Sequence, residues 1–175
     1  MDNNLNFQSG NSAFTYISQA QNAYSHYLQK KVELNTLDSN LNAVNRQFEI
    51  FPTQQNLFTV QEAWNRKLIV MQQIPQLVSD IAIYLKEATK QAFTSIQMSL
   101  ATNNKVNIIL SDNTLSSILL FLEQSPMKPY LPALYKQYCV NDNIPMQVSD
   151  IEIRARLSRM TIPNFDRIKV IIRGY

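Results

Sequence analysis

The chain contains very little glycine. Gly10 and Gly174 are the only two glycines among its 175 residues. Glycine provides the positive-φ backbone that tight hairpins, phosphate-binding loops and nucleophile turns require. Its scarcity therefore argues against large β-sheet architectures and against dinucleotide-binding or P-loop nucleotide sites.

Cysteine and histidine are scarcer still. Cys139 and His26 are each the single residue of their type, so no disulfide can form within the chain. One thiol and one imidazole are too few for a zinc site or a histidine-dependent nucleophilic centre. We interpret Cys139 as a small buried residue and His26 as a packing or surface residue. Accordingly we expect no cofactor, no metal, no small-molecule substrate and no enzymatic activity.

A secretory signal and long apolar runs are also lacking. The polar N-terminus has neither a basic region nor an apolar stretch. Apolar stretches such as Ile118–Leu122 are too short to cross a bilayer. We therefore predict a cytoplasmic or virion location and no membrane partner.

Helical periodicity dominates the first hundred residues. Between Ser12 and Phe48 there is neither Gly nor Pro, and apolar or small side chains recur at steps of three and four. This pattern predicts a long helix over about residues 12–50. The pattern loses phase at Lys30–Glu33, so a kink that divides the stretch into two helices is the alternative.

Two further helices are predicted before residue 102. The pattern Thr59–Glu62 is typical of a capping box and predicts a helix over residues 59–74. Pro75 suits the first turn of a third helix over residues 75–101. Antiparallel pairing would bury the apolar stripes of all three. We expect a flexible leader over residues 1–11 and a long-helix bundle or coiled-coil-like arm over residues 12–101.

Residues 102–175 are expected to form a cluster of short helices with a basic tail. Lys105–Leu110 is either a strand or a link, and residues 164–175 are either helical or end as a short C-terminal strand. The fold class that follows is mainly α. The short helices expected here are Thr114–Gln124 with Asn113 as its N-cap, Leu131–Cys139, and a helix from the capping box Ser149–Glu152 to about Met160, ended by Thr161–Pro163.

Positive charge gathers in the tail. From Lys128 onward, eight Lys or Arg residues stand against four acidic residues. Arginine favours bidentate contact with phosphate or carboxylate, so these side chains can meet nucleic acid through a helix–break–helix, meet acidic groups of a neighbouring subunit, or form a solvated face. The candidate contact residues are Arg154, Arg156, Arg159, Arg167, Lys169 and Arg173.

The long N-terminal helix also suggests an interface. A helix of that length cannot bury itself in a chain of 20.2 kDa, and tyrosine is enriched at interfaces. The candidate residues for packing between copies are Ile17, Tyr24, Tyr27, Leu34 and Leu41.

These patterns favour a non-enzymatic structural or assembly component that acts as a homo-oligomer or as a subunit of a larger complex. The abundance of Asn, Ile, Tyr and Phe, which have AT-rich codons, favours a viral or phage particle as the setting. One alternative is a nucleic-acid-binding protein that uses the C-terminal arginines. The other is a small helical adaptor or regulatory protein that captures a partner helix.

Overall fold

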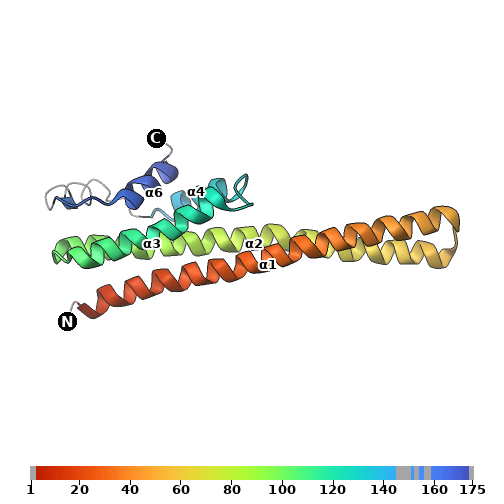
Figure 1. The fold of residues 1–175 in the computed structure, drawn as a ribbon, viewed down its shortest axis with the longest axis horizontal. Helices are drawn as coiled ribbons and strands as arrows, with labels where there is room; N and C mark the ends of the chain where they lie inside the picture. The colour runs from red at the N-terminus through yellow and green to blue at the C-terminus, as the bar shows by residue number, and fades with distance from the viewer. Residues whose placement is uncertain (1–2, 145–150, 152–153, 156–158, 174–175) are drawn as a thin grey trace. The chain divides into compact units, whose positions relative to one another are not determined.

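The computed structural model describes residues 3–144, 151, 154–155 and 159–173, with side chains from Ser12 onward. The described residues contain helices and no strand, which confirms the predicted mainly α fold (Figure 1). Residues 3–11, expected as a flexible leader, belong to the first helix. The helices are α1 (Asn3–Ile50), α2 (Gln54–Ala101), α3 (Lys105–Gln124), α4 (Leu131–Asn141) and α6 (Pro163–Arg173).

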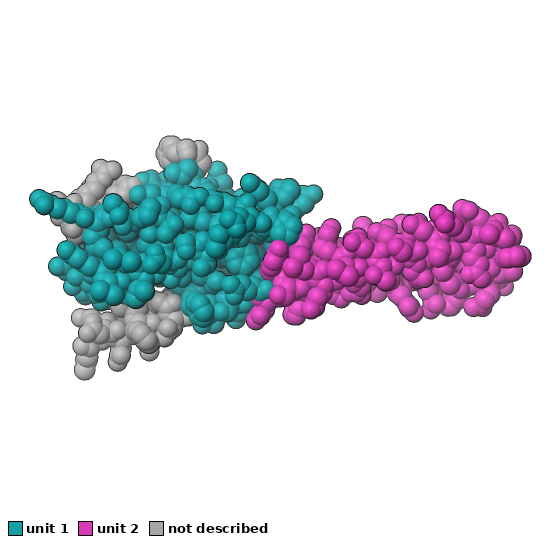
Figure 2. Space-filling model, in the orientation of Figure 1, with its two compact units in different colours: residues 1–21, 79–175 teal, residues 22–78 magenta. Residues whose placement is uncertain are grey.

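The chain divides into two compact units (Figure 2). We call Asn22–Val78 the hairpin unit, since it holds the antiparallel parts of α1 and α2 and the short turn between them. We call Met1–Gln21 with Ser79–Tyr175 the cluster unit. It contains the rest of α1 and α2 together with α3, α4 and α6.

A seam of inward-facing residues joins the two helices of the hairpin unit. Its members alternate in steps of four and three residues, which is the heptad spacing of coiled coils, and all are buried or half-buried. The members on α1 are Ala23, Tyr27, Lys30, Leu34, Leu37, Leu41, Val44 and Phe48, and those on α2 are Asn56, Val60, Ala63, Lys67, Val70, Ile74 and Leu77.

Helix α1 is continuous, so the alternative of a kink at Lys30–Glu33 is wrong. The seam keeps its spacing through Lys30, whose side chain is partly covered while its Nζ lies 2.7 Å from Glu33 Oε2. A lysine can occupy a seam position in this way because its aliphatic stem packs while its ammonium reaches water or a carboxylate. The apparent phase slip arises from counting Leu28, which is exposed, as part of the stripe.

Helix α2 replaces two predicted helices. It begins at Gln54, and Thr53 Oγ1 accepts a hydrogen bond from the Asn56 amide at 3.1 Å, so the predicted start at Thr59 is wrong. The predicted boundary at Pro75 is also wrong, because Pro75 lies inside α2. Proline in a helix removes one backbone hydrogen bond, at a cost of about 3 kcal/mol. Pro75 is exposed, while the seam residues on either side of it continue to pack.

Helix α3 begins nine residues before the predicted start at Thr114. Asn104 caps it by accepting a hydrogen bond from the Asn107 amide at 3.1 Å, whereas Asn113, the predicted cap, lies exposed in the middle of the helix. The alternatives of a strand or a link for Lys105–Leu110 are therefore wrong. Buried residues on one face explain the longer helix: Ile108, Ser111, Asp112, Leu115, Ile118, Leu119 and Leu122.

Hydroxyl pairs fix α3 and α4 against α2 in the cluster unit. Tyr135 of α4, which is fully buried, shares a hydrogen bond of 2.7 Å with Thr89 of α2. On α3, Ser111 shares one of 2.8 Å with Ser95. Because an unpaired buried hydroxyl is unfavourable, these pairs select one register of packing. Helix α4 confirms the prediction of a helix at Leu131–Cys139 and extends it to Asn141.

Helix α6 is held at its N-terminus by a buried carboxylate from α3. Asp112 Oδ1 accepts from the Phe165 amide at 2.8 Å, and Asp112 Oδ2 accepts from the Asn164 amide at 3.4 Å and the Asn164 side-chain Nδ2 at 3.1 Å. Pro163 has no amide to satisfy, so one carboxylate covers the free donors of the first turn. The helix continues to Arg173, and the alternative of a C-terminal strand is wrong because Phe165, Ile168 and Ile172 are buried at helical spacing.

Asparagine replaces glycine where two helices end. Asn103 follows α2 with φ 53° and Asn143 follows α4 with φ 43°. The amide of the residue after each asparagine donates a hydrogen bond to the carbonyl five residues earlier. Asn104 donates to Ser99 O at 2.8 Å, and Ile144 donates to Cys139 O at 3.3 Å. Asparagine tolerates this left-handed conformation better than most residues, so helices can end without glycine.

Replacing Asp112 with alanine should lower the free energy of unfolding by about 1–3 kcal/mol, because the α6 donors lose their buried acceptor. The matched control is Asn113→Ala, one residue along α3 and exposed, which should change it by less than about 0.5 kcal/mol. Chemical denaturation of both variants measures the difference. Equal stabilities would contradict the role given to Asp112.

Candidate functional site

The hairpin unit carries a second row of apolar residues on α2, outside the seam. Leu57, Trp64 and Met71 lie seven residues apart, and Leu68 follows Gln61 by seven. Each of these positions comes one residue after a seam position, so the row lies about 100° around the helix from the seam. The large side chains of this row and of its flank are 40–56% exposed: Leu57, Phe58, Trp64, Leu68, Ile69 and Met71.

This surface, which we call the outer face of α2, bears no charge. By helical geometry it also includes five residues between and beside the apolar ones: Gln61, Asn65, Gln72, Pro75 and Gln76. Three charged residues lie in the same stretch of α2. Glu62, seven residues before Ile69, borders the face on its flank, Lys67 borders it on the seam side, and Arg66 lies farther round the helix. The core of a protein interface typically has few charged residues and is enriched in Trp, Phe and Met, as this face is.

Trp64 is oriented by a contact that crosses the hairpin. Lys67 Nζ lies 5.0 Å from the centre of the Trp64 ring and 2.6 Å from Asp38 Oδ1 of α1. A cation over an indole ring is favourable, and the aspartate fixes the cation. The lysine thus covers part of the ring, and 44% of Trp64 stays exposed.

The five candidate interface residues on α1 are covered by the chain itself to different degrees. Ile17 is buried in the cluster unit, while Tyr27 and Leu41 are buried in the hairpin unit. Tyr24 and Leu34 are half-buried, and the Tyr24 ring stacks on Tyr27 with centroids 6.3 Å apart. The sequence reading missed the outer face of α2, although the sevenfold spacing of Leu57, Trp64 and Met71 could have revealed it.

The candidate basic residues do not gather on one face of α6. Arg167 pairs with Glu123 of α3, Lys169 is half-buried, and Arg173 lines a cleft of about 490 Å³. Arg154 and Arg159 are exposed, and Arg159 has φ 53°, in the left-handed region. Arg156, Ser149 and Glu152 of the predicted capping box, and most of the predicted helix to Met160 lie outside the described residues.

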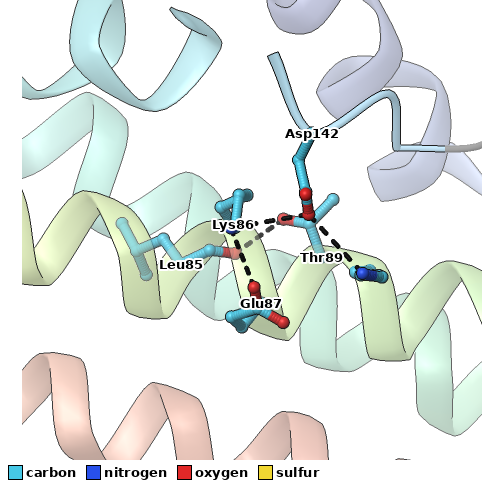
Figure 3. A network of polar contacts seen from close by, with 6 residues as sticks. Leu85, Lys86, Glu87, Thr89 and Asp142 are labelled. Atoms are coloured by element: carbon cyan, nitrogen blue, oxygen red, sulfur yellow. Dashed lines mark hydrogen bonds and ion pairs between the residues drawn. The ribbon is translucent and has the colours of Figure 1, made fainter. Parts of the chain in front are cut away.

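A charged network joins the end of α4 to α2 (Figure 3). The Asp142 carboxylate lies 3.4 Å from Lys86 Nζ and 3.5 Å from Lys90 Nζ, and Lys86 is 2.8 Å from Glu87. The Lys86 ammonium, helped by Lys90, lowers the pKa of Asp142. Burial opposes the charge of Lys86, but Glu87 and Asp142 outweigh it and raise the pKa of Lys86. These paired charges fix α4 to α2 and leave no unpaired acid or base among them.

A second exposed apolar set lies on α3 in the cluster unit: Val106, Ile109, Leu110 and Leu120. It has fewer large side chains than the outer face of α2 and no aromatic or methionine. Both α2 and α3 are long and apolar enough to cross a membrane by length and composition. A core helix of a soluble protein meets the same test, so the expected absence of a membrane partner stays a prediction.

No group of three or more potential metal ligands of the His, Cys, Asp or Glu type occurs among the residues that the structure describes. Comparison of the chain with protein families, with curated proteins and with solved structures gives no match. Any account of function therefore depends on the surfaces described above.

The thiol of Cys139 should be unreactive in the folded chain. Burial raises its pKa to about 12, so its nucleophilic thiolate is rare at pH 8. We expect alkylation by iodoacetamide at pH 8 to be at least about 100-fold slower in the folded chain than in urea, and to accelerate as the pH rises toward 12. Mass spectrometry of the alkylated chain measures both rates. Equal rates in the folded and unfolded chain would contradict the burial of Cys139.

Proposed function

We propose that this protein is a non-enzymatic assembly component that binds other helices through the outer face of α2. The observation that carries the proposal is a charge-free helix face with six large apolar side chains in a unit whose own seam is already filled. Leaving such a face in water is unfavourable, and apolar patches of this kind commonly mark interaction sites.

The size of the face fits a protein partner. Six large side chains at 40–56% exposure amount to on the order of 500 Å². Two such surfaces, if fully covered, reach roughly the 1,000 Å² that is the minimum for a biological interface and lie below the range of about 1,200–2,000 Å² of stable ones. The partner that suits this face is an apolar helix, because the row is straight and repeats every seven residues.

The biological setting in this proposal is a viral or phage particle, a choice supported by amino-acid composition alone. The nucleic-acid alternative is supported by the exposure of Arg154, Arg159 and Arg173. It has less support than assembly, because Arg167 is engaged with Glu123. An adaptor that captures a foreign helix would use the same outer face and would remain a monomer alone.

Light scattering after size exclusion tests the assembly role. The full-length chain should show a mass above 20.2 kDa at tens of micromolar, and Leu68→Glu should return it to the monomer because it places a charge at the centre of the face. The matched control is Val32→Glu on α1, an equally drastic change at a side chain that is 66% exposed, which should leave the mass unchanged.

Circular dichroism should show equal helix content in the two variants. A wild-type monomer at every concentration would contradict assembly by self-association. An oligomer that Leu68→Glu leaves intact would contradict the use of the outer face of α2.

A further inference from the structure

We propose that the outer face of α2 pairs with the same face of a second copy of this chain, with the two α2 helices antiparallel. This inference rests on the proposed function and names its partner and geometry. A second copy supplies the surface that the face requires: a straight apolar row with matching sevenfold spacing and no charge.

Charge permits the self-pairing. A charged face that meets its own copy brings like charges together, whereas the eleven positions of this face are uncharged. The nearest cation, Lys67, is already held by Asp38 at 2.6 Å, and that pair lies toward the seam. The eleven positions of the face can therefore meet their copies without like charges among them, and Glu62 lies at the flank of the face.

The sizes of the side chains favour the antiparallel direction. With a twofold axis at the level of Arg66, Trp64 lies opposite Leu68 of the second copy, and Met71 lies opposite Gln61. Each layer then combines a large with a smaller side chain, as close packing requires. A parallel, in-register pair would place Trp64 on Trp64 and Gln61 on Gln61. Antiparallel helices also align their dipoles favourably.

The resulting assembly resembles a four-helix arrangement of two hairpins. Each hairpin unit contributes one internal seam, and the outer faces of the two α2 helices form the contact between copies. Knobs-into-holes packing along such a contact is typical of helix bundles. The exposed part of Trp64 becomes buried against Leu68 of the second copy, at the centre of the contact.

Distances between spin labels test the direction. Single cysteines replace Asn65 or Gln76, both exposed at the flank of the face, in a Cys139→Ser background. In the antiparallel pair, the two labels at position 65 are separated along the axis by about 3 Å and those at position 76 by about 30 Å. In a parallel pair, both axial separations are close to zero.

A pair of charge variants gives a second, independent readout. Trp64→Arg and Leu68→Glu should each weaken self-association by about 100-fold or more, and the mixture of the two should recover it. In the mixed pair, the arginine at position 64 of one copy faces the glutamate at position 68 of the other, which explains the recovery. At the symmetry-related contact, the unchanged Leu68 still packs against the unchanged Trp64. In a parallel pair the two new charges are not opposite each other, so mixing gives no recovery.

The outcomes separate the two proposals. A monomeric wild-type chain contradicts both self-assembly and this pairing. An oligomer that Leu68→Glu dissociates, but whose labels give equal distances at both positions and whose variants do not recover on mixing, contradicts the antiparallel pairing and leaves the assembly role standing. Unequal label distances at positions 65 and 76, together with recovery of self-association on mixing, support both the assembly role and the antiparallel pairing.

Discussion

A helix that packs against only one other helix can bury only one of its faces. This limit applies to both helices of the hairpin unit. The seam between α1 and α2 fills the facing sides with residues such as Tyr27, Leu41 and Val70. Whatever apolar surface lies elsewhere on either helix has no third helix of the hairpin unit to cover it. The outer face of α2 is apolar surface of this kind, and in the proposed assembly a partner from outside the hairpin unit covers it.

The cluster unit solves the same problem within the chain. There α2 is joined by α3, α4 and α6, and its side chains Ile81, Leu85, Ala88 and Ile96 are fully buried. Polar contacts then select one arrangement among the many that apolar packing alone would allow. Asp112 holds the first turn of α6, Tyr135 bonds Thr89, and Asp142 joins the end of α4 to α2. The cluster unit thus combines a filled core with satisfied polar groups.

The helical class and the long first helix were predictable from the sequence, because their signal is the periodicity of apolar residues. Boundaries were less predictable, because packing overrides local preference. Pro75 is a helix breaker by intrinsic preference, yet the seam on both sides of it keeps α2 whole. Asn113 is a good cap by residue type, yet the buried Ile108 and Ser111 extend α3 ahead of it.

The candidate interface was predicted on α1 because its stripe is the one that the sequence displays most clearly. The stripe on α1 is easy to find, and the sequence alone cannot say whether another copy or the same chain covers it. The structure places Ile17, Tyr27 and Leu41 within the chain's own packing. The sevenfold spacing of Leu57, Trp64 and Met71 marks a row on α2 in the sequence, but that this row lies outside the seam is clear only once the seam is assigned, since the two rows differ by one residue.

Trp64 is the single tryptophan of the chain and lies at the centre of the outer face, so its fluorescence reports directly on whether that face is covered. The most direct test is acrylamide quenching of Trp64 across a dilution series of the full-length chain, with Leu68→Glu as the reference for an uncovered face. The account predicts that quenching weakens and emission shifts to the blue as the wild-type concentration rises, while the variant stays readily quenched throughout. Identical quenching of wild type and variant at every concentration would contradict it.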